Sequence, residues 1–464
     1  MQQAKILVTL GPSSSEAVQL QRLISAGATA MRLNFSHGTQ QEHLARVEAV
    51  RQVSQQLGQE VAILGDLCGP KLRVGCFGNQ SVTLKSGSTF VLTTENIIGD
   101  DTQVTVSYPL DEDLSVGDSL LLDDGLLSMV VVEIAPKRLV CRVTTGGVLS
   151  DHKGVNVPNV RLRTSAITPK DEQDILFGRQ IGVDWFALSF VRDADDVFRC
   201  KTLAGDIPVI AKLEKPEAVE HLAAIIAAAD GVMVARGDLG VEVGQERVPV
   251  IQKRAIELAN REGKLVITAT QMLDSMIHNP RPTRAEVSDV ANAIFDGSDV
   301  VMLSGETAVG KYPIETVGTM RAIIEQVEQS EQYLSRALPT VYKAAWESDN
   351  ATARAAATLS RDVKLAALVV LANDAHWLDI IADYRPFAPI VALVKDMGLA
   401  RRIALQWGIT AHIVQFPQSQ QELIELSEAT VRKSISVQSG ADIAILAPSL
   451  PHQLGRTLTL WKLS

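Results

Sequence analysis

The chain has 464 residues, of which 46% are hydrophobic, so it is long enough for two or three domains that each bury a core. Its 44 Lys and Arg stand against 54 Asp and Glu, and the formal net charge of -10 argues against non-specific binding to nucleic acid or to an anionic membrane. An anionic substrate must therefore be attracted by local positive charge.

The cysteines and the first residues point to a cytoplasmic protein. No CxxC or Cys/His spacing is present, so neither a zinc site nor a disulfide framework is indicated; the four cysteines are Cys68, Cys76, Cys141 and Cys200. The start of the chain has no signal-peptide profile, and no apolar run reaches the roughly 18 residues of a spanning helix. We expect a reduced, soluble protein.

Short β-branched runs alternate with amphipathic helical stretches, as in βα units around a parallel sheet. The first block predicts strands at Lys5 to Thr9, Ala28 to Leu33, Val61 to Gly65, Trp185 to Leu188, Pro208 to Ala211, Gly231 to Ala235, Leu265 to Thr268 and Val300 to Leu303. Eight strands close a (β/α)8 barrel. The predicted fold class is therefore α/β, with a TIM barrel formed by residues 1–69 and 166–333.

An all-β insertion is predicted between the third and fourth barrel strands, over residues 70–165. Val, Thr and Leu alternate there between Gly turns, and no long helical period is found. An insertion at this rim of a barrel is well placed to act as a lid.

After the barrel we predict a helix from Pro313 to Gln332, a linker over residues 334–350 and a C-terminal α/β domain over residues 351–464. The strands of this domain are predicted at Ala367 to Leu371, Ile390 to Val394, Ala411 to Val414 and Ile443 to Leu446.

A polar residue follows every predicted barrel strand. In chain order these are Thr9, Asn34 with Ser36, Asp66, Ser189, Lys212 with Glu214, Gly237 with Asp238, Thr270, and Ser304 to Thr307. Any one of them alone is accounted for by a turn, a helix cap or a salt bridge. Because the carboxyl ends of parallel strands meet at one rim, the full set favours a functional site.

The charged members of this set indicate a magnesium site that holds phosphate. Glu214 and Asp238 supply two hard oxygen ligands, which suits Mg²⁺ because it keeps waters and takes substrate oxygens. Lys212 can neutralise a phosphoryl group in transfer, and Arg32 and Arg73 can bind its outer oxygens.

Three local motifs lie at or near the ends of these strands. The amides of Gly237 and Asp238 lie at a strand-to-helix turn and can bind an anion. The string from Gly305 to Tyr312 resembles a P-loop, but Tyr312 replaces the Ser or Thr that binds magnesium, so we reject that interpretation. The tripeptide Arg236-Gly237-Asp238 lies at a barrel strand end and is not interpreted as an adhesion signal.

Four longer strings resemble the pyruvate kinase family. They are Met31 to Gly38 (MRLNFSHG), Val234 to Glu242 (VARGDLGVE), Ile267 to Leu273 (ITATQML) and Asn279 to Glu286 (NPRPTRAE). The resemblance is specific through about residue 330 and weaker beyond it. It implies Mg²⁺-dependent phosphoryl transfer from phosphoenolpyruvate to ADP, giving pyruvate and ATP in the last step of glycolysis, with Mn²⁺ as a substitute metal. It also implies a homotetramer.

The resemblance also implies roles for single residues. Glu214 and Asp238 would hold magnesium, Lys212 would stabilise the phosphoryl group and the enolate, and Thr270 would relay the proton. The substrate pocket would comprise Arg32, Arg73, Ser189, Lys212, Gly237, Asp238 and Thr270. The nucleotide would contact Arg32, Asn34, His37, Arg73 and Lys153. Asp124 is a weaker lid candidate, with a turn carboxylate as the alternative.

The chain departs from the family at its monovalent-cation site. Many members bind potassium through the equivalents of Asn34, Ser36, Asp66 and the carbonyl of Leu67, with Glu at the position of Lys71. One fixed ammonium can hold this corner and would repel a second cation. We therefore predict activity without potassium, with a solvated Lys71 as the alternative.

A second departure concerns the C-terminal domain, where the family often binds an activating sugar phosphate in a Ser, Thr and Gly-rich loop. This chain has Ala372-Asn373-Asp374-Ala375-His376-Trp377, which lacks those donors and carries an acidic residue. We predict that sugar-phosphate activation at this loop is lost.

Two other functions remain alternatives. A magnesium-dependent barrel lyase acting on pyruvate enolates would use similar residues, but it leaves Lys212 and the insertion unexplained. A catalytically inactive sensor or scaffold would bind the same ligands without turnover. ADP-dependent release of pyruvate separates the three.

Overall fold

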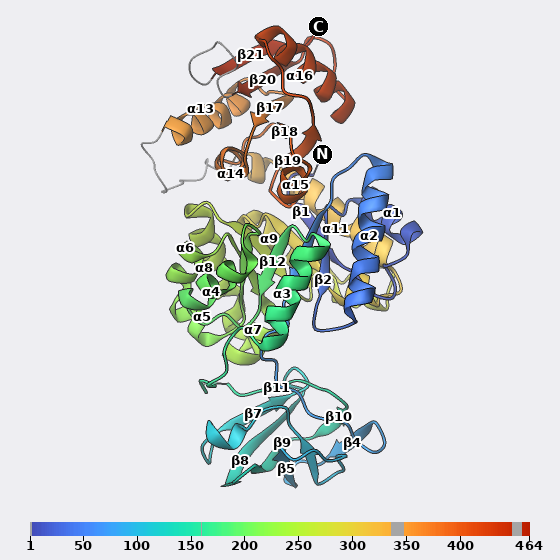
Figure 1. Ribbon diagram of the computed structural model, residues 1–464, viewed down its shortest axis with the longest axis vertical. Coiled ribbons are helices and arrows are strands. Elements are labelled where there is room, and N and C mark those ends of the chain that lie inside the picture. The colour runs from blue at the N-terminus through green and yellow to red at the C-terminus, as the bar shows by residue number, and fades with distance from the viewer. Residues whose placement is uncertain (1, 159, 336–347, 448–456) are drawn as a thin grey trace.

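The computed structural model describes residues 2–158, 160–335, 348–447 and 457–464. Its three parts are stacked along the long axis, with the barrel in the middle, the β insertion at one end and the C-terminal domain at the other (Figure 1). None of the helices in these ranges combines the length and the apolar character needed to cross a membrane.

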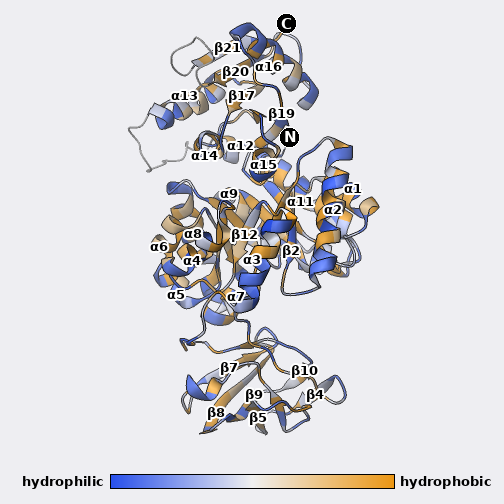
Figure 2. Ribbon diagram, viewed as in Figure 1, coloured by the Kyte–Doolittle hydropathy of each residue, from blue (hydrophilic) through white to orange (hydrophobic). Residues whose placement is uncertain are grey.

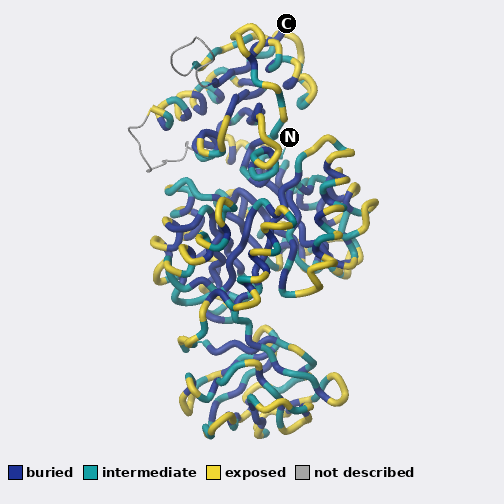
Figure 3. The backbone as a smooth tube through the Cα atoms, in the orientation of Figure 1, coloured by how far each residue is buried: buried dark blue, intermediate teal, exposed yellow. Residues whose placement is uncertain are grey.

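The central part is a closed barrel of parallel strands, in the order β1-β16-β15-β14-β13-β12-β3-β2. Its strands are β1 (Lys5–Thr9), β2 (Ala30–Asn34), β3 (Ala62–Asp66), β12 (Trp185–Leu188), β13 (Val209–Leu213), β14 (Gly231–Ala235), β15 (Leu265–Ala269) and β16 (Val300–Leu303). All eight predicted strands are present, so the predicted barrel is confirmed. Most of their residues are buried because helices cover the outer face (Figure 3).

Helices alternate with the barrel strands and turn their polar faces outward (Figure 2). They are α1 (Ala17–Ala26), α2 (Gln40–Leu57), α3 (Pro169–Ile181), α4 (Ala194–Ala204), α5 (Pro216–Glu220), α6 (Leu222–Ala228), α7 (Arg236–Val243), α8 (Val248–Arg261), α9 (Arg284–Asp296), α10 (Gly305–Ala308), α11 (Pro313–Glu328) and α12 (Glu331–Leu334). Capping boxes begin α2, α3 and α9, where Thr39, Thr168 and Thr283 accept from the third amide of the helix. The helix predicted to reach Gln332 ends at Glu328, because Ser330 caps a new helix.

The insertion forms an all-β body with a six-stranded sheet, β11-β7-β8-β9-β5-β6, and a two-stranded sheet, β10-β4. Its strands are β4 (Ser81–Leu84), β5 (Thr89–Thr93), β6 (Gln103–Thr105), β7 (Ser119–Leu122), β8 (Leu127–Ala135), β9 (Arg138–Thr145), β10 (Gly147–Ser150) and β11 (Val155–Asn156). Alternate residues of β9 are buried, as expected for strands with one solvated face.

The C-terminal domain has a sheet in the order β19-β18-β17-β20-β21. Its elements are α13 (Ser348–Asp362), β17 (Ala367–Ala372), α14 (Ala375–Asp383), β18 (Ile390–Val394), α15 (Met397–Ile403), β19 (Ile409–Ile413), α16 (Gln420–Ser434), β20 (Asp442–Ala447) and β21 (Thr457–Lys462). The antiparallel edge strand β21 was not predicted. Most of the predicted linker, residues 334–350, lies outside the described residues, and at its ends Leu334 belongs to α12 and Ser348 begins α13.

The C-terminal domain packs against the N-terminal end of the barrel strands. Ala404 and Leu405, which follow α15, belong to the same apolar cluster as barrel-interior residues such as Leu7 and Met302. Lys5 Nζ donates to the carbonyl of Ile409 at 2.6 Å. The insertion therefore lies at the opposite, carboxyl-terminal rim of the barrel.

Candidate functional site

The polar residues that follow five of the eight barrel strands, β2, β3, β12, β13 and β14, meet in one pocket of about 100 Å³ at the carboxyl-terminal rim. Parallel strands bring their carboxyl ends to the same end of the barrel, so residues distant in sequence become neighbours. The lining is Arg32, Asn34, Ser36, His37, Asp66, Cys68, Lys71, Arg73, Ser189, Phe190, Lys212, Glu214 and Asp238. Of the predicted site residues, Lys153, Leu67, Gly237 and Thr270 do not line this pocket.

Lys212 is held at the centre of this pocket. Its Nζ lies 2.8 Å from Glu214 Oε1, 3.2 Å from Asp66 Oδ1 and 2.7 Å from Ser189 Oγ. The residue is only 9% exposed, and burial alone would lower the pKa of the ammonium group. The charges of Asp66 and Glu214 outweigh burial and raise the pKa of Lys212 above its ordinary value, so the ammonium stays charged.

Arg32 and Asp66 form a second ion pair in the same network. Arg32 Nε lies 2.6 Å from Asp66 Oδ2, and Arg32 Nη1 donates to Thr9 Oγ1 at 3.0 Å. Burial would raise the pKa of Asp66, but Lys212 and Arg32 together lower it below its usual value. Asp66 therefore fixes two cations with one buried carboxylate.

Glu214 and Asp238 are the two carboxylates predicted to hold a metal ion. Glu214 Oε2 accepts a hydrogen bond from the amide of Phe190 at 2.9 Å. Burial is the main cause that raises the pKa of Glu214, and the negative charge of Asp238 adds to it, although the positive charge of Lys212 opposes the shift. Burial would raise the pKa of Asp238 as well, but Lys71 and Lys212 lower it. The two hard donors therefore repel each other across a shared pocket, and a divalent cation fits this donor set.

The described residues contain no group of three or more His, Cys, Asp and Glu that could by itself hold a metal ion. Two carboxylates suit magnesium in particular, because Mg²⁺ fills its remaining positions with water and substrate oxygens. Calcium would require a larger set of protein oxygens.

Lys71 reaches the pocket from the start of the insertion. Its Nζ lies 3.0 Å from Asp238 Oδ1, and it shares the pocket with Asn34, Ser36 and Asp66 of the predicted monovalent-cation set. The carbonyl of Leu67, the remaining member of that set, accepts from Ser189 Oγ at 2.7 Å. The ammonium of Lys71 is thus paired with a carboxylate.

Thr270 follows β15 with a backbone φ of +70°, which is rare for a β-branched residue. Its Oγ1 accepts from the amide of Gly237 at 2.8 Å and donates to the carbonyl of Ala269 at 2.6 Å. The Gly237 amide is therefore used within the protein, and an anion would have to replace Thr270 there. Strained residues of this kind concentrate at functional sites.

Arg236 supports the Thr270 loop, a contact that the sequence did not predict. Arg236 Nη2 donates to the carbonyl of Thr270 at 2.7 Å, and Arg236 Nη1 pairs with Asp289 Oδ1 at 2.7 Å. The only sequence signal was its position directly after β14.

Only some of the residues that are predicted to contact the nucleotide lie near one another in the structure. His37 lines the pocket with Arg32 and Arg73. Burial lowers the pKa of His37, and the positive charges of Arg73, Arg32 and Lys71 lower it further, so the imidazole is neutral near pH 7. Arg73 Nη1 donates to the carbonyl of His152 at 2.9 Å. Lys153 instead pairs with Asp123 at 2.8 Å within the insertion. Asp124 is exposed in that turn, with φ of +53°.

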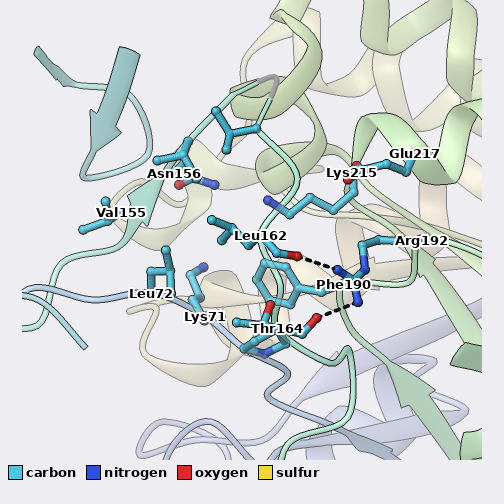
Figure 4. Close-up of a pocket in the computed structure, with 13 residues that line it drawn as sticks. Lys71, Leu72, Val155, Asn156, Leu162, Thr164, Phe190, Arg192, Lys215 and Glu217 are labelled. Atoms are coloured by element: carbon cyan, nitrogen blue, oxygen red, sulfur yellow. Dashed lines mark hydrogen bonds between the residues drawn. The ribbon is translucent and has the colours of Figure 1, made fainter. Parts of the chain in front are cut away.

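A buried carboxylate joins the insertion to the barrel beside this pocket. Glu242 Oε1 accepts from Asn156 Nδ2 of the insertion at 2.8 Å and lies 2.7 Å from Lys215 Nζ. A neighbouring cavity of about 30 Å³ is lined by both parts, and Figure 4 shows Lys215, Phe190 and Lys71 around it. In the same view Arg192 donates to the carbonyls of Leu162 and Thr164, at 2.9 and 2.6 Å. Sequence reasoning missed Glu242 as a contact to the insertion.

Comparison with known proteins gives matches along almost the whole chain. The family profile described as "Pyruvate kinase, barrel domain" matches residues 1–317, and "Pyruvate kinase, alpha/beta domain" matches residues 350–460, so the resemblance is not confined to the first 330 residues. "Pyruvate kinase 2" of Synechocystis sp. is 43% identical over 98% of this chain and 78% of its own length. "Pyruvate kinase" of Geobacillus stearothermophilus is 43% identical over 96% and 77%, and that of Clostridium perfringens is 40% identical over 96% of both chains. The chain belongs to the pyruvate kinase family.

Proposed function

We propose that the protein is a pyruvate kinase, which transfers the phosphoryl group of phosphoenolpyruvate to ADP with Mg²⁺ and yields pyruvate and ATP. The observation that carries the proposal is the set of contacts around Lys212, whose ammonium lies between Asp66 and Glu214 in the pocket that Asp238 also lines. A fixed cation beside two carboxylates suits a phosphorylated substrate and its metal ion.

Each group contributes by its charge and position. Lys212 would face the transferred phosphoryl oxygens and then the enolate oxygen, and Arg32 and Arg73 would bind outer phosphate oxygens. Magnesium held by Glu214 and Asp238, or manganese in its place, would neutralise charge on those oxygens. The hydroxyl of Thr270, released from the carbonyl of Ala269, or a water bound to it, would deliver the proton to the methylene carbon.

The nucleotide would lie at Arg32, Asn34, His37 and Arg73. Lys153 would join them only after leaving Asp123, its partner within the insertion, and we propose that the insertion acts as a lid over the nucleotide. We propose that residues 70–165 form the lid domain and that residues 351–464 form the C-terminal domain.

We further propose that catalysis needs no potassium. The ammonium of Lys71 occupies the pocket that Asn34, Ser36 and Asp66 line, where it supplies one fixed positive charge. A monovalent cation in the same corner would be repelled.

The loop at Asn373 and Asp374 supports the loss of sugar-phosphate activation there. The Asp374 side chain caps α14, and the adjoining pocket of about 120 Å³ is lined by Asp349 and Asp374. Two carboxylates at this position disfavour a phosphate.

A coupled assay of pyruvate formation tests the main proposal. Release of pyruvate should require phosphoenolpyruvate, ADP and Mg²⁺ together, and fructose or ribose phosphates should leave the saturation curve unchanged. Pyruvate release without ADP would indicate a lyase, and ligand binding without release would indicate an inactive sensor.

Location and assembly complete the proposal. Each of the four cysteines is free, which suits the cytoplasm. A homotetramer follows from the family resemblance alone, and light scattering on the purified protein tests it.

A further inference from the structure

The loop between β2 and α2 carries three residues of the pocket at the carboxyl-terminal rim. Asn34 ends β2, Ser36 and His37 follow it, and all three line the pocket. Under the proposed function, on which this inference rests, Asn34 and His37 contact the nucleotide. The way in which the loop is held therefore bears on the binding of ADP.

Phe35 anchors this loop on the side away from the pocket. The residue is buried and is not among those that line the pocket. Its ring lies edge-on to the ring of His43 on α2, with the ring centres 5.0 Å apart, and 6.4 Å from the ring of Phe177 on α3. These two helices lie side by side (Figure 1). The loop is thus tied to both of them by one aromatic side chain.

His43 holds the backbone of the loop at its far end. Nε2 of this buried side chain lies 2.9 Å from the carbonyl oxygen of His37. A carbonyl oxygen can only accept, so Nε2 carries the ring proton and donates it. Nδ1 is buried and has no hydrogen-bond partner among the described residues. The ring therefore makes its one hydrogen bond to the loop.

The charge state of His43 suits this single contact. Burial is the main cause that lowers the pKa of His43, and the positive charges of Arg46 and, less strongly, Lys170 add to it. The hydrogen bond to His37 and the negative charge of Glu42 oppose the shift. The imidazole is therefore neutral near pH 7 and acts as a fixed donor.

Lys170 holds the carbonyl on the other side of Ser36. Its Nζ donates to the carbonyl of Phe35 at 2.7 Å and lies 2.5 Å from Asp174 Oδ2, one turn further along α3. Neither Lys170 nor His43 lines the pocket. Each of them can therefore affect a bound ligand only through the loop.

We propose that His43 and Lys170 are positioning residues for ADP, which hold the carbonyls of His37 and Phe35 and thereby direct Asn34 and His37 toward the nucleotide. A loop that is held before the ligand arrives loses less conformational freedom on binding. Without either donor, ADP should bind more weakly. The binding of phosphoenolpyruvate should change little, because Ser189 and Lys212 lie outside this loop.

Steady-state kinetics and calorimetric titration with MgADP on the full-length protein test this inference. His43→Leu removes the donor, so KM for ADP and Kd of MgADP should rise at least about fivefold, while KM for phosphoenolpyruvate changes by less than about twofold. His43→Gln keeps an N–H donor and should recover most of the loss. Lys170→Met removes the second donor and should act in the same direction as His43→Leu.

Gln41→Leu is the matched control, because it makes the same kind of change at an exposed position in the first turn of α2 and should leave both substrates unaffected. Thermal unfolding checks that each variant is folded, and Lys170→Met decides the result if His43→Leu is not. Calorimetry needs no turnover, so MgADP binding without pyruvate release would reject the proposed function and leave the positioning role intact.

Three results would overturn the inference. The first is a wild type that does not bind MgADP. The second is equal affinity for MgADP in the wild type, His43→Leu and Lys170→Met. The third is an equal rise of KM for both substrates, or a His43→Gln variant as impaired as His43→Leu.

Discussion

Lys71 Nζ lies 3.0 Å from Asp238 Oδ1, which joins the start of the insertion to the end of a barrel strand in the pocket at the carboxyl-terminal rim. Both side chains are 26% exposed, so solvent screens this ion pair only in part. The pair places a fixed positive charge in the pocket that Asn34, Ser36 and Asp66 also line.

Replacing potassium with sodium or Tris should change kcat of the wild type by less than about twofold, because Lys71 supplies the charge. Lys71→Glu reverses that charge, so its kcat should fall without potassium and recover when potassium is added. Lys85→Glu, the same change at an exposed turn of the insertion, serves as the control. A large loss of wild-type activity in sodium would refute the substitution argument.

Lys212→Gln should lower kcat by at least about a hundredfold, because it removes the one ammonium that faces both Asp66 and Glu214. Steady-state assays measure the loss, and circular dichroism checks that the barrel is intact. Lys253→Gln removes an exposed ammonium on α8 and should leave kcat unchanged. A kcat within about twofold of wild type would remove Lys212 from the mechanism.

Thr270→Val should lower both activity and stability, while Thr270→Ser should keep most of each. Valine leaves the Gly237 amide without an acceptor, which costs about 1 to 3 kcal/mol of unfolding free energy. Serine keeps the oxygen and eases the strain of a β-branched residue at φ of +70°. Denaturant unfolding and kcat are measured on both variants, and equal behaviour of the two would contradict a role for the hydroxyl.

Glu242→Gln should loosen the insertion from the barrel. The change removes the charge that pairs with Lys215 and weakens the acceptor for Asn156, a loss of roughly 2 kcal/mol. Limited proteolysis should cut the segment around residue 160 faster in this variant, and small-angle scattering should report a larger radius. Glu246→Gln, an exposed neighbour, should match the wild type; unchanged proteolysis in Glu242→Gln would show that this contact does not hold the insertion.

The contribution of Asp379 to the stability of the folded protein should fall as pH rises from about 4 to about 7. Burial raises the pKa of Asp379 in the folded chain to about 7, with Arg402 opposing and with Asp230, Asp374 and Asp299 adding to the rise. The folded state therefore holds this proton after the unfolded state has released it, and the loss is complete above pH 7, at up to about 4 kcal/mol.

Asp379→Asn isolates this contribution, because its unfolding free energy lacks the Asp379 titration. The difference between variant and wild type should grow between pH 4 and 7 in favour of the variant and stay constant above that range. A difference that does not depend on pH would exclude the titration of Asp379.

The barrel and much of the pocket at its carboxyl-terminal rim could be predicted from the sequence. Each buried strand is a short apolar run, and a polar residue such as Lys212 or Asp66 lies at its carboxyl-terminal end. Since parallel strands align their carboxyl ends, these local signals were enough to place the residues at one rim. The antiparallel strand β21 was missed because its alternating pattern lies at the edge of an otherwise parallel sheet.

Only the tertiary structure decided which charges pair with which. The contacts of Lys71 with Asp238, of Lys153 with Asp123 and of Glu242 with Asn156 depend on how separate parts of the chain dock and on which rotamers they select. The same holds for Asp379, which lies where the C-terminal domain meets the barrel and whose buried Oδ1 has no hydrogen-bond partner among the described residues. The hydrophobic periodicity of the sequence indicates which residues lie at the ends of the buried strands. The partner of each charged side chain depends on distances in the folded protein, which no local sequence pattern specifies.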